Sequence, residues 1–149
     1  MPTITPGYVY TFIALVAVCS LLLLSFIAYA DALRVSSEAK QLKNLMSYVA
    51  AKSTELLTLT LTTNATSQIF LQMPTSIGSK EYWLQMHNGS VGAWVEGGLG
   101  NTPVNGTDMR VYLPEVASAT GYYVGGYGAA LLQCHLNAGT PTIELESSS

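Results

Sequence analysis

An uncharged apolar stretch near the N-terminus constrains this chain more than any other feature. It covers residues 8–30, YVYTFIALVAVCSLLLLSFIAYA, and contains no Asp, Glu, Lys or Arg. A helix of about 23 residues rises roughly 35 Å, which is enough to cross a bilayer core of roughly 30 Å. A cleavable signal peptide has a shorter apolar core with basic residues in front, and no basic residue precedes this stretch. We therefore predict a retained structural helix.

The helical pattern continues beyond Ala30 but becomes amphipathic. No Gly or Pro lies between Tyr8 and Leu57, and charged residues fall mostly between apolar ones at helical spacing. The apolar positions are Val35, Ala39, Leu42, Met46, Val49 and Leu56. We predict one helix over residues 8–57, with an apolar half at 8–30 and an amphipathic half at 31–57. Residues 1–7, which hold two prolines and a glycine, form a leader or short N-terminal segment.

The remainder, residues 58–149, has the pattern of a β-rich globular head. Leu and Thr alternate strictly over residues 57–62, which suits a strand or a helix-to-strand transition. Further strand candidates are residues 68–73, 81–86, 92–95, 109–113, 131–136 and 142–145. The segments between them, 74–78, 87–89, 96–106 and 121–128, are rich in Gly, Asn and Pro and predict turns. The fold class predicted is α+β: a long N-terminal apolar helix followed by a small antiparallel β-sandwich-like head.

Composition argues against several functional classes. Charged residues make up only 10% of the 149 residues and the net charge is −3, so nothing attracts nucleic acid or an anionic membrane surface. Cys19 lies in the apolar stretch and Cys134 in the head, so we predict no internal disulfide, and the spacing of the two cysteines does not suit a metal site. We expect no cofactor.

No catalytic arrangement is evident. His87 falls in a predicted turn and His135 in a predicted strand, and neither has Asp, Glu or Cys at ligand or triad spacing. Cys134 and His135 should lie on opposite faces of their strand, which defeats a dyad. Residues 97–100 and 125–128 lack the helix and lysine of a phosphate loop and are predicted turns. We predict that the chain is not an enzyme.

Five aromatic residues of the head admit two interpretations. They are Trp83, Trp94, Tyr122, Tyr123 and Tyr127. Packing in the core is the favoured interpretation, and an outer patch or a contact between subunits is the alternative.

Three N-glycosylation sequons provide evidence about which side of the membrane the head occupies. Asn64, Asn88 and Asn105 each begin an N-x-S/T triplet, a pattern that also arises by chance in Thr-rich sequence. Basic residues follow the apolar stretch, and the positive-inside rule applied to them places the head in the cytoplasm. The sequons and the β-rich, weakly charged head favour the outside. We favour the outside, because the basic residues alternate with acidic ones along a helix face.

The architecture and several short motifs resemble the archaeal type IV pilin-like superfamily, which includes the archaeal flagellins. The motifs are LQMPTSIGSKEYWLQM at residues 71–86, Leu113-Pro114 and GYYVGGYG at residues 121–128. The resemblance implies an extracellular filament that serves adhesion, aggregation or motility and has no active site. Its subunits are inserted in the membrane before a secretion-type ATPase and a platform protein assemble them. It places leader cleavage between Gly7 and Tyr8, where the family has a basic residue before the glycine and this chain has Pro6.

Physical chemistry supports self-assembly independently of the resemblance. Outside lipid, the apolar stretch must be covered by other copies of itself, or a large apolar area faces water. The helix positions predicted to mediate polymerisation are Tyr8, Phe12, Leu15, Val16, Leu22, Leu23, Phe26, Ile27, Val35, Leu42, Met46 and Val49. One alternative is a single-pass surface protein that does not polymerise, such as a minor pilin or a stator-like component that binds the envelope. Another is a binding module that the helix only tethers.

Overall fold

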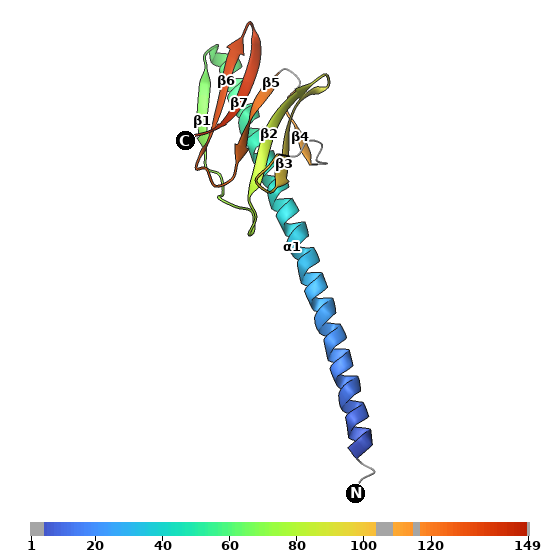
Figure 1. The fold of residues 1–149 in the computed structure, drawn as a ribbon. Helices are drawn as coiled ribbons and strands as arrows, with labels where there is room; N and C mark the ends of the chain where they lie inside the picture. Colours follow the sequence, from blue (N-terminus) through green and yellow to red (C-terminus); the bar gives the residue numbers. More distant parts are fainter. Residues whose placement is uncertain (1–4, 104–108, 115–116, 149) are drawn as a thin grey trace. The chain divides into compact units, whose positions relative to one another are not determined.

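The predicted α+β architecture is confirmed by a computed structural model, which describes residues 5–103, 109–114 and 117–148. These residues form one helix, α1, followed by seven strands (Figure 1). The elements are α1 (Thr5–Thr63), β1 (Ser67–Leu71), β2 (Tyr82–Gly89), β3 (Gly92–Leu99), β4 (Arg110–Tyr112), β5 (Ser118–Val124), β6 (Ala130–Asn137) and β7 (Thr140–Ser147).

Helix α1 is 59 residues long and extends beyond both predicted ends. Pro6 lies in its first turn, where a missing N–H breaks no intrahelical bond. The strand or transition predicted over residues 57–62 is wrong, because these residues are helical. Leucines 56 and 57 are buried against the sheet, and the helix ends before Asn64, whose φ of 53° suits asparagine at a helix C-terminus. An alternating pattern of only six residues is compatible with a strand or with a helix. Burial against the sheet decides in favour of the helix.

The chain divides into two compact units, residues 1–37 and residues 38–149. The first unit holds the N-terminal part of α1. The second holds the remainder of α1 and all seven strands. We refer to the second unit as the head.

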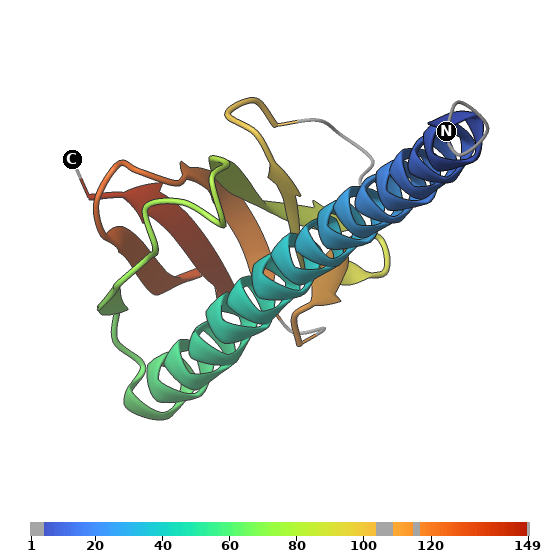
Figure 2. The ribbon, with the colours of Figure 1, turned by 90° about the horizontal axis from the view of Figure 1, so that it is seen from below.

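The strands form one sheet in the order β1-β6-β7-β5-β2-β3-β4. Every described strand pair is antiparallel except β5 with β7, which is parallel. Residues 38–63 of α1 lie along one face of this sheet (Figure 2). The head therefore has two layers, as a sandwich does, but only one of them is a sheet. The other layer is the amphipathic part of α1, which supplies the apolar side chains that a second sheet would otherwise provide.

The core of the head lies between α1 and the sheet. Leu42, Met46 and Val49 on the helix are fully buried, as are Leu84 and Val95 on the sheet. Burying an apolar side chain of this size stabilises a fold by about 1.5–3 kcal/mol. Residues 38–63 of α1 are thus an integral part of the head.

One predicted turn, and part of two others, are strand instead. Residues 87–89 belong to β2, residues 96–99 to β3 and residues 121–124 to β5, whereas residues 74–78 and 125–128 lie between strands, as predicted. Several of the glycines serve close packing. A Cβ on Gly97 would lie 3.0 Å from Met46 Sδ, and one on Gly98 would lie 2.8 Å from the Trp83 ring. Part of the turn predicted over 96–106 lies outside the described residues.

Candidate functional site

The N-terminal part of α1 presents a continuous apolar surface. Every residue from 6 to 37 is exposed within this chain, including apolar side chains whose exposed fractions run from 47% at Val16 to 74% at Tyr10. Nine predicted polymerisation residues are among them: Tyr8, Phe12, Leu15, Val16, Leu22, Leu23, Phe26, Ile27 and Val35. We call residues 8–35 the assembly segment, after the role that the sequence analysis predicts for them.

Three other predicted polymerisation residues lie elsewhere. Leu42, Met46 and Val49 are fully buried against the sheet of their own chain, so they are not available to a second copy. The sequence could not separate these three from the exposed group, because both groups follow the same helical period. Burial by the sheet is a tertiary property.

Three hydroxyl groups of the assembly segment, on Thr11, Ser20 and Ser25, are satisfied within the helix. Thr11 donates to the Gly7 carbonyl at 2.9 Å, Ser20 to Val16 at 2.7 Å and Ser25 to Leu21 at 2.8 Å. Bonds of this kind satisfy the Ser and Thr hydroxyls without water, which an apolar environment requires. Among the described residues, one helix, Pro6–Thr63, is long and apolar enough to cross a membrane. The segment therefore suits either lipid or a bundle of similar helices.

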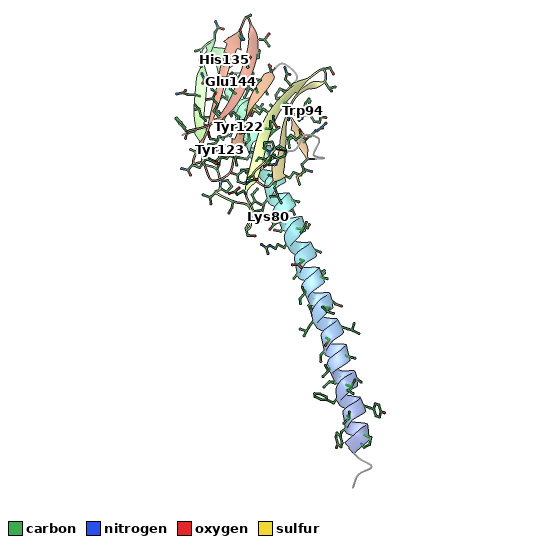
Figure 3. The ribbon with its side chains drawn as sticks, in the orientation of Figure 1. Lys80, Trp94, Tyr122, Tyr123, His135 and Glu144 are labelled. Carbon is green, nitrogen blue, oxygen red and sulfur yellow. The ribbon has the colours of Figure 1, made fainter. Side chains whose placement is uncertain are left out.

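A buried acid marks the point where α1 enters the head. Glu38 is 2% exposed, and its Oε2 lies 3.0 Å from Lys80 Nζ (Figure 3 labels Lys80). Gly78 packs against this carboxylate, since a Cβ there would lie 2.6 Å from Glu38 Oε1. The pair ties the loop before β2 to the helix.

A second buried acid, Glu96 on β3, lies close to a histidine and an arginine. Its Oε2 lies 3.1 Å from His87 Nε2 on β2, and its Oε1 lies 3.9 Å from Arg110 Nε on β4. His87 stacks on Trp94 with ring centroids 5.6 Å apart, and the Arg110 guanidinium lies 5.4 Å from the Trp94 centroid. The sequence analysis missed this carboxylate partner because strand pairing places it nine residues away. The arrangement balances a buried charge.

The second histidine, His135, lies beside a cysteine on β6. Cys134 is buried and the neighbouring His135 is half-buried, as expected for side chains on opposite faces of β6. Within residues 5–103, 109–114 and 117–148, no group of three or more His, Cys, Asp or Glu side chains is placed to hold a metal ion.

The five aromatic residues of the head differ in how far their side chains are exposed. Trp83 and Tyr123 are each 1% exposed and Trp94 is half-buried, whereas Tyr122 and Tyr127 are 60% and 67% exposed. Burial raises the pKa of Tyr123, and burial together with the neighbouring Tyr123 raises the pKa of Tyr82. Both therefore stay neutral near pH 7 and donate hydrogen bonds, Tyr82 to the Pro74 carbonyl and Tyr123 to that of Gly128. The predicted packing in the core thus holds for Trp83 and Tyr123 but not for Tyr122 and Tyr127.

The exposed tyrosines line an open concavity of about 1150 Å³ on the head, which we call the tyrosine groove. Figure 3 labels Tyr122 and its buried neighbour Tyr123 on β5. The lining comes from β2, β5 and β7, from the residue before β2 and from the segments after β3 and β5: Glu81, Gln85, Asn101, Thr102, Pro103, Gly121, Tyr122, Tyr123, Val124, Tyr127, Leu145, Glu146 and Ser147.

Two of the three sequons lie in the described part of the chain, and both are exposed. Asn64 follows the last residue of α1, and Asn88 lies near the end of β2, where its Nδ2 donates to Ser118 Oγ at 2.9 Å. The third, Asn105, lies outside the described residues. Gly7 and Tyr8, the predicted cleavage position, are exposed in the first two turns of α1.

The chain was compared with protein-family models, with curated proteins and with solved structures, and none of the three comparisons found a match.

Proposed function

We propose that this chain is a structural subunit of an extracellular filament of the archaeal type IV pilus-like class and that it polymerises through the assembly segment. The observation that carries the proposal is the uninterrupted exposure of apolar side chains along residues 8–35 of a helix that lacks charge up to Asp31. Such a filament serves adhesion, aggregation or motility.

The energetics of the exposed segment support self-association. Each large apolar side chain removed from water contributes about 1.5–3 kcal/mol. In the membrane, lipid provides this burial. In a filament, the same segments of neighbouring copies provide it, so polymerisation replaces one apolar environment by another. The core of the head contains no side chain of this segment. Proposed partners are therefore other copies, the membrane before assembly, and the secretion-type ATPase and platform protein of the resembled superfamily.

A second function is supported by the same helix. A single apolar helix of sufficient length also suits a membrane anchor for a surface protein that does not polymerise, such as a minor pilin or an envelope-binding stator component. Electron microscopy of material sheared from cells, with mass spectrometry of its subunit, separates the two. Filaments built from this chain support the first function, and recovery only in the membrane fraction supports the second.

The variant Leu22→Asp tests the role of the assembly segment. Leu22 is 53% exposed in the middle of the segment, and an unpaired carboxylate in a helix bundle costs several kcal/mol. We expect no filaments by electron microscopy, with the head still folded as judged by the fluorescence of Trp83.

Val91→Asp is the matched control. Val91 is 75% exposed in the turn between β2 and β3, so the same kind of change there should leave filament yield unaltered. Detection of Leu22→Asp in the membrane fraction shows that insertion has not failed. Filaments of Leu22→Asp at normal yield contradict the proposal.

A further inference from the structure

Several residues that line the tyrosine groove lie on the face of the sheet that α1 leaves uncovered. Gln85 pairs with Tyr122 across β2 and β5, and both belong to the strand face opposite the buried Leu84 and Tyr123. Glu146 follows Leu145, which pairs with Gly121 just before Tyr122. Strand pairing therefore sets an exposed tyrosine between an amide and a carboxylate.

Other residues that line the groove add a second aromatic ring and further hydrogen-bonding side chains. Tyr127, in the turn after β5, provides a second exposed ring. Glu81 precedes β2, and Asn101 and Thr102 follow β3. Amide and hydroxyl groups both donate and accept hydrogen bonds, and carboxylates accept them. The groove thus combines flat aromatic surfaces with a rim of hydrogen-bonding groups.

The charge of the groove restricts its ligands. Among the described residues that line it, Glu81 and Glu146 are acidic and none is Lys, Arg or His. An anionic ligand would meet only like charge, which excludes phosphates, nucleic acids and acidic polysaccharides. A purely apolar ligand would leave the amides and carboxylates without partners.

We propose that the tyrosine groove binds a neutral oligosaccharide. Sugar rings have hydroxyl groups around the edge, which match the amide and carboxylate groups. They also have C–H faces, which match the electron-rich face of a tyrosine ring. Tyr122 and Tyr127 stack on sugar rings, while Gln85, Asn101 and Glu146 bind hydroxyls. A volume of about 1150 Å³ has room for several sugar units. This activity belongs to the head and does not depend on polymerisation.

Binding is measured on the full chain in micelles of a detergent without sugar groups, by saturation-transfer NMR and titration. The probes are chitotetraose and maltotetraose as neutral oligosaccharides, tetralysine as a cationic peptide, and a sulfated tetrasaccharide as an anionic sugar. We expect saturable binding of a neutral probe and none of the sulfated one. Tyr122→Ala and Tyr127→Ala should each weaken binding about three- to tenfold.

Tyr112→Ala is the matched control, because Tyr112 on β4 is also 60% exposed and does not line the groove. It should bind the neutral probe like the unchanged chain. Three results overturn the proposal: neither neutral probe binds, only tetralysine binds, or all three tyrosine variants lose affinity equally. The second result would identify a cationic peptide as the occupant. Because the assay uses micelles, its outcome is separate from that of the filament experiment.

Discussion

At the scale of single residues, glycines set how closely the strands approach. Gly121 has a φ of +105°, and a Cβ there would lie 2.1 Å from the Leu145 carbonyl oxygen. Backbone atoms of a paired strand cannot move aside as the end of a flexible side chain can. Gly121 therefore permits the parallel pairing of β5 with β7 and, through it, the placement of Tyr122 beside Glu146.

Gly121→Ala should destabilise the head by about 3 kcal/mol or more, because backbone strain and a backbone clash act together. Gly100→Ala is the control. Gly100 also has a positive φ, +116°, but a Cβ there would meet nothing within 4 Å, so only strain of about 1–2 kcal/mol applies. Thermal unfolding of the full chain in micelles, followed by tryptophan fluorescence, measures both. Equal losses of Tm would show that the close approach is unimportant.

At the scale of elements, the two ends of α1 differ in the environment of their apolar side chains. Residues 8–35 expose apolar side chains, whereas the later turns bury theirs against the sheet. The two regions differ in charge as well, since no charged residue occurs before Asp31. A single helix thus belongs to the assembly segment at one end and to the core of the head at the other.

Two leucine variants of α1 distinguish these two regions. Leu42→Ala removes a fully buried side chain and should destabilise the head by about 2–5 kcal/mol. Leu33→Ala changes a side chain that is 54% exposed and should alter head stability by less than about 0.5 kcal/mol. Unfolding of the full chain in micelles, followed by tryptophan fluorescence, provides the comparison. Similar destabilisation by both variants would contradict the division of α1.

At the scale of the whole molecule, we expect burial of apolar surface to contribute more to the proposed association between copies than charge does. Charged residues form 10% of the chain and the net charge is −3, so long-range electrostatics contribute little to association. The assembly segment offers apolar surface with almost no charge. The proposed filament is therefore held together mainly by the hydrophobic effect, which salt does not screen.

Filaments should accordingly resist high salt. Raising NaCl from about 0.1 M to 1 M shortens the Debye length from about 10 Å to 3 Å and removes most interactions between exposed charges. We expect the sedimentable fraction of sheared filaments to stay constant or increase. A fall in that fraction, with release of soluble subunits, would show that ion pairs between subunits hold the filament together.

The sequence by itself determined the long helix and the β-rich head, because an uncharged apolar stretch and short segments bounded by Gly, Pro and Asn act locally. It also separated Cys134 from His135, since side chains alternate along a strand. Only the tertiary structure decided that residues 57–62 stay helical, that Leu42, Met46 and Val49 are buried, and that Glu96 meets His87 and Arg110. The tyrosine groove likewise depends on strand order, which brings β5 between β7 and β2. Pairings between distant segments leave no local pattern, so the sequence could not reveal them.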